Sequence, residues 1–247
     1  MLAYKRNFVW RDEFTLWDDA VHKSPNKARP YNSRGTIYGK KGNFIQAISD
    51  LSRAIEINPN YEEAYNNRGN AYKDQGSIQQ AISDYNKAIE INPNYFEAYT
   101  NRGIAYDNQG NFTQAISDYT KSIAINPNYA DAYYNRGIIY DNRGNFTQAI
   151  SDFTRAIGIN PNDAESYSSR GVTYNKQGNF TQAISDFNRA IEINPSLEEA
   201  YNNRGIAYYT AREYDKAWAD VHKVEELGYA VNPEFLKELK KASGRDK

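Results

Sequence analysis

The chain has 247 residues, with 30 basic and 31 acidic side chains and a formal net charge of −1. This balance, without a basic stripe, argues against nucleic acid as a partner, and the absence of cysteine excludes disulfides and thiolate metal sites. No apolar run approaches the roughly 18–20 residues of a membrane span, so we expect a soluble chain with no direct membrane insertion.

Residues 1–27 are predicted to form the second half of an incomplete helical hairpin. The segment WRDEFTLWDDAVHKSPN (10–26) aligns with the second half of the 34-residue repeat that follows, with Trp10, Trp17 and Pro25 at repeat positions. The preceding residues lack the apolar core of a signal peptide. We expect either a natural half-repeat that caps the N-terminal end or the start of a fragment of something longer.

From residue 28 the sequence repeats every 34 residues. The repeats are 28–61, 62–95, 96–129, 130–163, 164–197 and 198–231. Glycine recurs at 35, 69, 103, 137, 171 and 205, tyrosine at 38, 72, 106, 140, 174 and 208, and alanine at 47, 81, 115, 149, 183 and 217. A period of this length predicts helix–turn–helix units stacked as a solenoid.

The third repeat, 96–129, shows the unit in detail. Both halves carry apolar residues at helical spacing, and Gly110 and Asn111 separate them. We expect the Asn111 side chain to cap the second helix, with Gln114 completing a capping box. Pro127 ends that helix, because proline lacks an amide and disfavours helix before it.

Residues 232–247 are predicted to form a C-terminal capping helix and a short tail. Asn232-Pro233 can start the helix, and Phe235, Leu236 and Leu239 would cover the last repeat. The lysines of the same segment would face water, which keeps the end of a solenoid soluble.

The unit resembles the tetratricopeptide repeat, whose pattern is an aromatic, Leu-Gly, Tyr, Ala, an aromatic, Ala and Pro. In the third repeat these positions are Tyr99, Arg102-Gly103, Tyr106, Ala115, Tyr119, Ser122 and Pro127. The resemblance covers residues 28–231. It implies an all-α fold, a right-handed α-solenoid of tandem helix–turn–helix units.

One departure from the family pattern recurs in every repeat. Where the family has leucine, this chain has Arg34, Arg68, Arg102, Arg136, Arg170 and Arg204, and the second helices carry Asp50, Asp84, Asp118, Asp152, Asp186 and Asp220. We predict that arginine and aspartate pair, within a repeat or across to the next, through charge-assisted hydrogen bonds. Ligand binding by the arginines is the alternative.

The resemblance also implies a ligand groove lined by the first helix of each repeat. Position six of the repeats reads Ser33, Asn67, Asn101, Asn135, Ser169 and Asn203. Asparagine amides both donate and accept, so this row can bind an extended peptide backbone whatever its side chains. A similar asparagine row lines the tetratricopeptide superhelix of O-GlcNAc transferase.

Two other groove positions suggest what the ligand carries. Position nine reads Thr36, Asn70, Ile104, Ile138, Val172 and Ile206, an apolar stripe over the last four repeats to which Tyr134 adds aromatic surface. Position two reads Arg29, Glu63, Glu97, Asp131, Glu165 and Glu199, which predicts an acidic wall or a solvated face favoured by the helix dipoles. We expect a protein or peptide ligand with apolar anchors and some basic residues. A clamp for an acidic tail is not expected, because positions five and six lack basic residues.

No pattern in the chain predicts catalysis. The two histidines, His22 and His222, lie at opposite ends, so neither a metal site nor a catalytic triad can assemble around them. Phosphate-binding glycine loops are absent from the sequence. We therefore expect a non-enzyme without cofactor or metal.

Two interpretations of the biological context remain open. The first is a stand-alone cytoplasmic scaffold that binds a peptide or protein segment. The second is the soluble region of a larger membrane-bound protein, outside the cytoplasm, because residues 4–35 resemble the junction in bacterial polytopic glycosyltransferase-like proteins with tetratricopeptide repeats. End-to-end self-association is a third expectation, through Phe8, Trp10, Phe14 or Trp17 at the N-terminal end.

Overall fold

The computed structural model describes residues 12–245, and all regular secondary structure in that range is α-helical. The chain divides into two compact units, Met1–Pro127 and Asn128–Lys247. The first unit contains α2 (Glu13–Lys23), α3 (Ala28–Lys40), α4 (Phe44–Ile57), α5 (Glu62–Asp74), α6 (Ile78–Ile91), α7 (Phe96–Asn108) and α8 (Phe112–Ile125). The second contains α9 (Ala130–Asn142), α10 (Phe146–Ile159), α11 (Ala164–Lys176), α12 (Phe180–Ile193), α13 (Glu198–Thr210), α14 (Tyr214–Glu226) and α15 (Pro233–Ser243).

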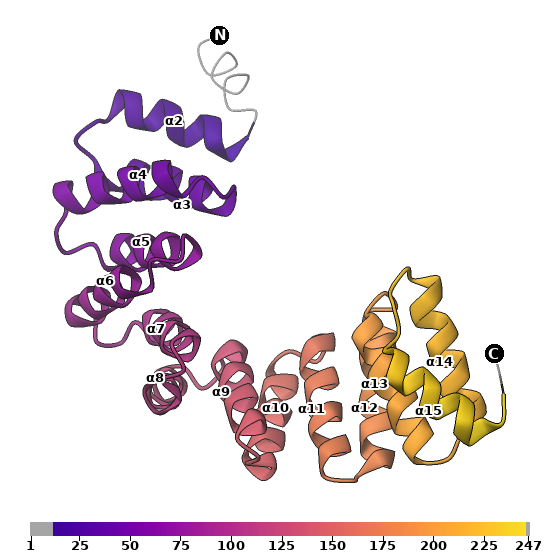
Figure 1. Cartoon of the computed structure of the whole chain (residues 1–247). Coiled ribbons are helices and arrows are strands. Elements are labelled where there is room, and N and C mark those ends of the chain that lie inside the picture. The colour runs from indigo at the N-terminus through magenta and orange to yellow at the C-terminus, as the bar shows by residue number, and fades with distance from the viewer. Residues whose placement is uncertain (1–11, 246–247) are drawn as a thin grey trace. The chain divides into compact units, whose positions relative to one another are not determined.

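Consecutive helices pack as hairpins in both units (Figure 1). In the first unit α3 packs on α4, α5 on α6 and α7 on α8, and each hairpin contacts the next through α4–α5 and α6–α7. The second unit repeats this arrangement from α9 to α14. The first helices also approach one another, α3 with α5 and α5 with α7, as well as α9 with α11 and α11 with α13. The predicted all-α solenoid of helix pairs is confirmed.

The two helices of a hairpin approach closely because glycine meets a large ring. A Cβ atom added to Gly69 would lie 2.6 Å from Cε1 of Tyr85, and one on Gly103 would lie 2.7 Å from Cε1 of Tyr119. Both rings are fully buried. Only the bare glycine backbone therefore leaves room for the ring of the second helix.

The turn within a hairpin depends on glycine rather than on an asparagine cap. Gly110 has a φ of +72°, a region that glycine enters without steric cost. The predicted capping box at Asn111 is wrong, because Asn111 makes no side-chain hydrogen bond to the helix end. Its backbone N–H instead donates to the carbonyl of Tyr106 at 2.8 Å. With φ −89° and ψ 66°, Asn111 departs from the extended conformation usual for a capping residue.

The Asn-Pro pairs end the second helices as predicted. In α6, the backbone N–H of Asn92 donates to the carbonyl of Ala88 at 2.9 Å, which is the last helical bond. The side chain of Asn92 then accepts from the backbone N–H of Asn94 at 3.1 Å. This local turn leads the chain around Pro93 into the next repeat.

Each end of the described chain is covered by one further helix. Helix α2 packs on α3, where the rings of Phe14 and Tyr38 meet edge to face at 5.2 Å. At the other end the Asn232 side chain caps α15, and Leu239 is fully buried in a cluster with Trp218. Phe14 and Trp17 are half-buried, while Phe8 and Trp10, also named for self-association, lie outside the described residues.

Candidate functional site

The recurring arginines and aspartates meet within each repeat, between its first and second helix. Arg68 donates from Nε and Nη2 to the two carboxylate oxygens of Asp84, both at 2.8 Å, and Arg102 does the same to Asp118, both at 2.7 Å. The same two-bond pairing joins Arg34 to Asp50, Arg136 to Asp152, Arg170 to Asp186 and Arg204 to Asp220. The geometry is the fork-to-fork arrangement that arginine and carboxylate favour.

The remaining arginine nitrogen links one hairpin to the preceding one. Nη1 of Arg68 donates to the Ser52 hydroxyl at 3.0 Å, and Nη1 of Arg102 donates to the Asn86 side chain at 2.6 Å. The equivalent acceptors are Asp18 for Arg34, Thr154 for Arg170 and Asn188 for Arg204. Sequence reasoning missed these acceptors, although a small polar residue recurs at that position from Ser52 onward.

The guanidinium groups are enclosed as well as paired. The Cζ atom of Arg102 lies 5.5 Å from the ring centre of Tyr99 and 5.9 Å from that of Tyr106. Hydrogen bonding to Asp84 raises the pKa of Arg68 above its usual value. Because these arginines already bind protein groups on every side, we propose that their role is to hold the hairpins together rather than to bind a ligand.

The asparagine row of the first unit is partly used by the protein itself. Nδ2 of Asn67 donates to Asn32 at 3.0 Å and to the Thr36 hydroxyl at 3.2 Å, and Nδ2 of Asn101 donates to Asn66 at 2.9 Å. Both asparagines thus bridge to the preceding first helix and keep their Oδ1 atoms as acceptors. The row therefore presents the Oδ1 acceptors of both residues and one remaining N–H of Asn101, whereas the sequence predicted amides that are entirely free to donate and accept.

The second unit uses the same position differently. Nδ2 of Asn135 donates to the carbonyl of Asp131 in its own helix at 2.8 Å. The hydroxyl groups of Tyr134 and Ser169 lie 3.4 Å apart. Asn203 is half-buried, and its backbone carbonyl accepts from Asn175 at 3.4 Å. Among the described residues of this unit, no position-six side-chain amide donates to the preceding first helix as Asn67 and Asn101 do.

The predicted apolar stripe is only partly accessible. Ile104, Ile138 and Val172 are half-buried, and Ile206 is the one member that is exposed, at 37%. Asn70, in the same repeat position, accepts a hydrogen bond of 2.7 Å from the hydroxyl of Tyr85. The stripe thus contributes as much to the packing of the repeats as to a surface.

The acidic wall is exposed over the second unit. Asp131, Glu165 and Glu199 are exposed and Glu97 is half-buried. Glu165 and Glu199 line a hollow of about 310 Å³ together with Tyr134, Ser168, Ser169, Leu197 and Glu198. No basic side chain lines this hollow, which fits a basic ligand group.

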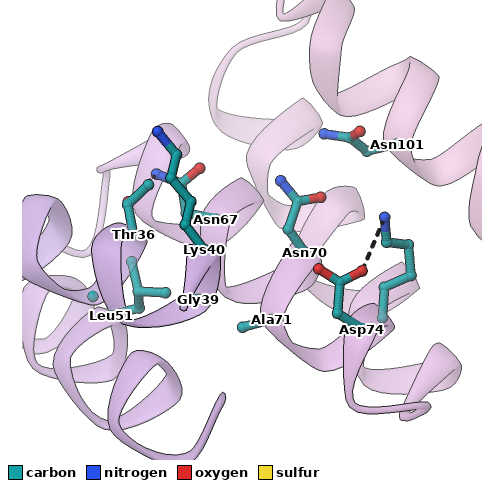
Figure 2. A pocket seen from close by; sticks show the side chains of 11 residues that line it. Thr36, Gly39, Lys40, Leu51, Asn67, Asn70, Ala71, Asp74 and Asn101 are labelled. Atoms are coloured by element: carbon teal, nitrogen blue, oxygen red, sulfur yellow. Dashed lines mark hydrogen bonds and ion pairs between the residues drawn. The ribbon is translucent and has the colours of Figure 1, made fainter. Parts of the chain in front are cut away.

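The first unit contains a pocket of about 380 Å³ between α3, α4, α5 and α7, here named the Leu51 pocket (Figure 2). Its lining consists of Gly35, Thr36, Gly39, Lys40, Leu51, Asn67, Asn70, Ala71, Lys73, Asp74 and Asn101. In the view of Figure 2, Asn67, Asn70 and Asn101 lie above Leu51, Gly39 and Ala71, so amide groups line one side of the pocket and apolar residues form its floor. The sequence predicted the asparagines but not the pocket.

A buried charge in the second unit was also not predicted. Asp141 of α9 is 9% exposed and its Oδ2 pairs with Lys176 of α11 at 2.5 Å. The other carboxylate oxygen of Asp141 and the Oδ1 of Asn175 are buried without a partner among the described residues. The signal in the sequence was that Asp141 and Lys176, which carry opposite charges, lie near the ends of successive first helices, α9 and α11.

Comparison with known proteins identifies the family. A family model described as TPR repeat matches residues 35–76, 69–110 and 171–211, and one described as tetratricopeptide repeat matches 96–129 and 130–163. The crystal structure of MamA protein is 31% identical over 67% of this chain and 91% of that chain, with a TM-score of 0.58. The chain belongs to the tetratricopeptide repeat family, whose fold is generally a non-catalytic scaffold for protein interactions.

Other solved structures share the fold. The Cut9–Hcn1 hetero-tetramer of the APC/C matches with a TM-score of 0.78 and 19% identity over 94% of this chain, which spans 46% of that chain. YrrB, described as a TPR protein with an unusual peptide-binding site, matches with a TM-score of 0.57 and 21% identity over 74% of this chain and 95% of that one. No curated protein matches the sequence.

The membrane-linked interpretation gains no support from these matches. Across the described residues, no helix is both long enough and apolar enough to span a bilayer. The likeness of residues 4–35 to the junction in glycosyltransferase-like proteins has no counterpart in the relatives reported above, so that alternative stays a prediction.

Proposed function

We propose that this chain is a non-catalytic scaffold that binds an extended peptide segment of another protein against its first helices. The observation that carries the proposal is the pair of asparagines Asn67 and Asn101, whose Nδ2 groups are held by the preceding helix. Their acceptor oxygens are thereby fixed in orientation and can accept hydrogen bonds from the backbone N–H groups of a peptide, which every residue except proline supplies.

Charge and apolar surface would add selectivity to this backbone recognition. The exposed acidic residues Asp131, Glu165 and Glu199 favour basic ligand groups in the second unit. Exposed Ile206 supplies an apolar contact in the same unit. The ligand class is therefore a peptide or protein segment with apolar anchors and some basic residues, and the reaction class is binding alone.

The test is affinity capture with the wild-type chain, an Asn67→Ala/Asn101→Ala variant and a matched control. The control is Gln80→Ala/Gln114→Ala, which removes two exposed amides from the second helices α6 and α8. Captured proteins are then divided into overlapping synthetic peptides. We expect peptides that bind the wild type and the glutamine variant but not the asparagine variant. Equal binding to all three would overturn the proposal.

A further inference from the structure

The Leu51 pocket exists because two side chains that other repeats carry are missing. The residue that packs under the repeat glycine is Tyr85, Tyr119, Phe153 or Phe187 in the next four repeats, but Leu51 in the first. Leu51 covers Gly35, with its Cγ 2.8 Å from where a Cβ would be, yet an isobutyl group ends short of the outer atoms of a ring.

The second missing side chain is at residue 39. Position twelve of the repeat is Gly39 here and Lys73 and Asp107 in the other two repeats of the unit. A Cβ added to Gly39 would meet only the Cβ of Ala47, at 3.9 Å. Open space thus remains on the α3 side as well, and the two absences together account for a cavity of about 380 Å³. Sites for small ligands start at about 300 Å³, so the cavity can hold a side chain.

The floor and the mouth of the pocket have different chemistry. Leu51, Gly35, Gly39 and Ala71 provide no side-chain polar atom. At the mouth Lys73 pairs with Asp74 at 3.2 Å. Lys40 is exposed and pairs with no carboxylate of the described residues. The floor therefore favours an apolar group, and the mouth retains an uncompensated positive charge.

A second unused donor lies beside the first. Oδ1 of Asn70 accepts the hydroxyl of Tyr85 at 2.7 Å, which fixes the amide and leaves its Nδ2 group without an acceptor in the described part of the chain. The Lys40 ammonium and the Asn70 amide are both donors that line one pocket. Among the groups of a peptide, a carboxylate accepts from both and also compensates the ammonium charge.

We propose that the Leu51 pocket is a specificity subsite that receives an apolar side chain adjacent to a carboxylate. This inference rests on the proposed function, because Asn67 and Asn101 at the same pocket would hold the ligand backbone. The carboxylate has two sources, an acidic residue next to the apolar one or the free carboxyl terminus of an apolar last residue. The subsite is built by the first unit alone, and the acidic residues of the second unit form no part of it.

The test uses synthetic peptides in a serine–alanine background, with binding measured by fluorescence anisotropy. One set carries Leu-Glu, Leu-Lys or Ser-Glu at its centre, and a second ends in leucine with either a free or an amidated carboxyl terminus. We expect the Leu-Glu peptide or the free terminal leucine to bind the wild-type chain most tightly. Strong binding of only one of the two identifies the source of the carboxylate.

Two variants fill the pocket from opposite walls. Leu51→Phe introduces the ring that Phe153 and Phe187 place under the same repeat glycine, and Gly39→Leu adds a side chain from α3 at a position with room for it. Each should weaken the preferred peptide roughly tenfold or more, the equivalent of losing one buried apolar side chain. Circular dichroism checks that each variant keeps the helical fold. One folded variant is enough to test whether the pocket binds the side chain.

Two further variants separate this subsite from peptide binding as such. Lys40→Gln should reduce the preference for Leu-Glu over Leu-Lys by up to about fivefold, the effect expected of an exposed charge. Asn67→Ala/Asn101→Ala should weaken all peptides alike. If the asparagine variant loses binding but Leu51→Phe and Gly39→Leu do not, the subsite is refuted and the proposed function stands. If no peptide binds the wild-type chain, the subsite is refuted, and the capture experiment with Asn67→Ala/Asn101→Ala decides the proposed function by itself.

Discussion

The second and third repeats, 62–95 and 96–129, have the same helix pair but differ at the hydroxyl group of a buried tyrosine. Both place a tyrosine ring under the repeat glycine, and both rings are fully buried. In the second repeat the hydroxyl of Tyr85 donates to Asn70 at 2.7 Å. In the third, isoleucine takes the place of that asparagine, and the hydroxyl of Tyr119 is buried without a partner in the described chain.

This difference shows that a repeat can keep its helix packing while the hydrogen bonding of a buried side chain changes. Burial raises the pKa of both tyrosines, so each stays protonated and offers one O–H donor. The fourth and fifth repeats avoid the unpaired donor, since they carry Phe153 and Phe187. The third repeat combines the tyrosine of the second with the apolar position nine of the fourth.

The largest expected effect concerns what the two repeats share. Arg68→Leu or Arg102→Leu would leave the buried carboxylate of Asp84 or Asp118 without its partner. We expect each to lower the free energy of unfolding by about 3 kcal/mol, the low end for a broken buried pair because the arginines retain some exposure. Urea unfolding followed by circular dichroism measures it. The control Lys121→Leu removes an exposed charge on α8 and should change stability by less than about 0.5 kcal/mol. A loss below about 1 kcal/mol in both arginine variants would contradict a structural role.

Replacement of the glycine that contacts the tyrosine ring should be equally destabilising in both repeats. Gly69→Ala and Gly103→Ala bring a methyl group to 2.6 Å and 2.7 Å of a fully buried ring. We expect each to cost about 1–3 kcal/mol, the usual range for overpacking. The control is Gly158→Ala, where no atom lies within 4 Å and the matching position of the third repeat is already Ala124. That change should stabilise by roughly 0.5–1 kcal/mol through helix propensity. Tolerance of alanine at Gly69 or Gly103 would mean that the ring can move.

Removing the hydroxyl of Tyr85 should destabilise the second repeat. Tyr85→Phe deletes the hydrogen bond to Asn70 and leaves the asparagine oxygen without its donor. We expect a loss of about 1 kcal/mol, because Asn70 is half-buried and can reach water. The free energy of unfolding and amide hydrogen exchange of α5 and α6 both report it. An unchanged exchange rate would show that the hydrogen bond contributes nothing.

The same substitution in the third repeat should have the opposite sign. Tyr119→Phe deletes a buried hydroxyl that has no partner, so we expect stability to stay constant or rise by up to about 1 kcal/mol. Restoring the missing partner then tests the cause. In the background Ile104→Asn, where the second repeat's arrangement is rebuilt, Tyr119→Phe should become destabilising. A double-mutant cycle with no coupling between the two positions would refute this explanation.

Local patterns determined most of the fold. The period of 34 residues, the apolar spacing, the turn glycines such as Gly110 and the Asn-Pro stops each act within one or two helical turns. They therefore predicted the helix pairs and the C-terminal helix that begins at Pro233. The capping box at Asn111 failed for two reasons: the backbone N–H that Gln114 was expected to accept donates to the Tyr106 carbonyl instead, and the φ and ψ of Asn111 depart from the capping conformation.

Tertiary structure alone decided which side chains meet between neighbouring helices. The sequence by itself determined that arginine and aspartate recur together, but not that the third arginine nitrogen reaches Ser52 or Asn86 in the preceding hairpin. It determined a row of asparagines, but not that Asn67 and Asn101 donate to the preceding first helix. It places Leu51 and Gly39 where the next repeat has Tyr85 and Lys73. Only the packing of α3 against α4 and α5 turns them into a pocket, because a cavity depends on side chains that meet in space and are absent together.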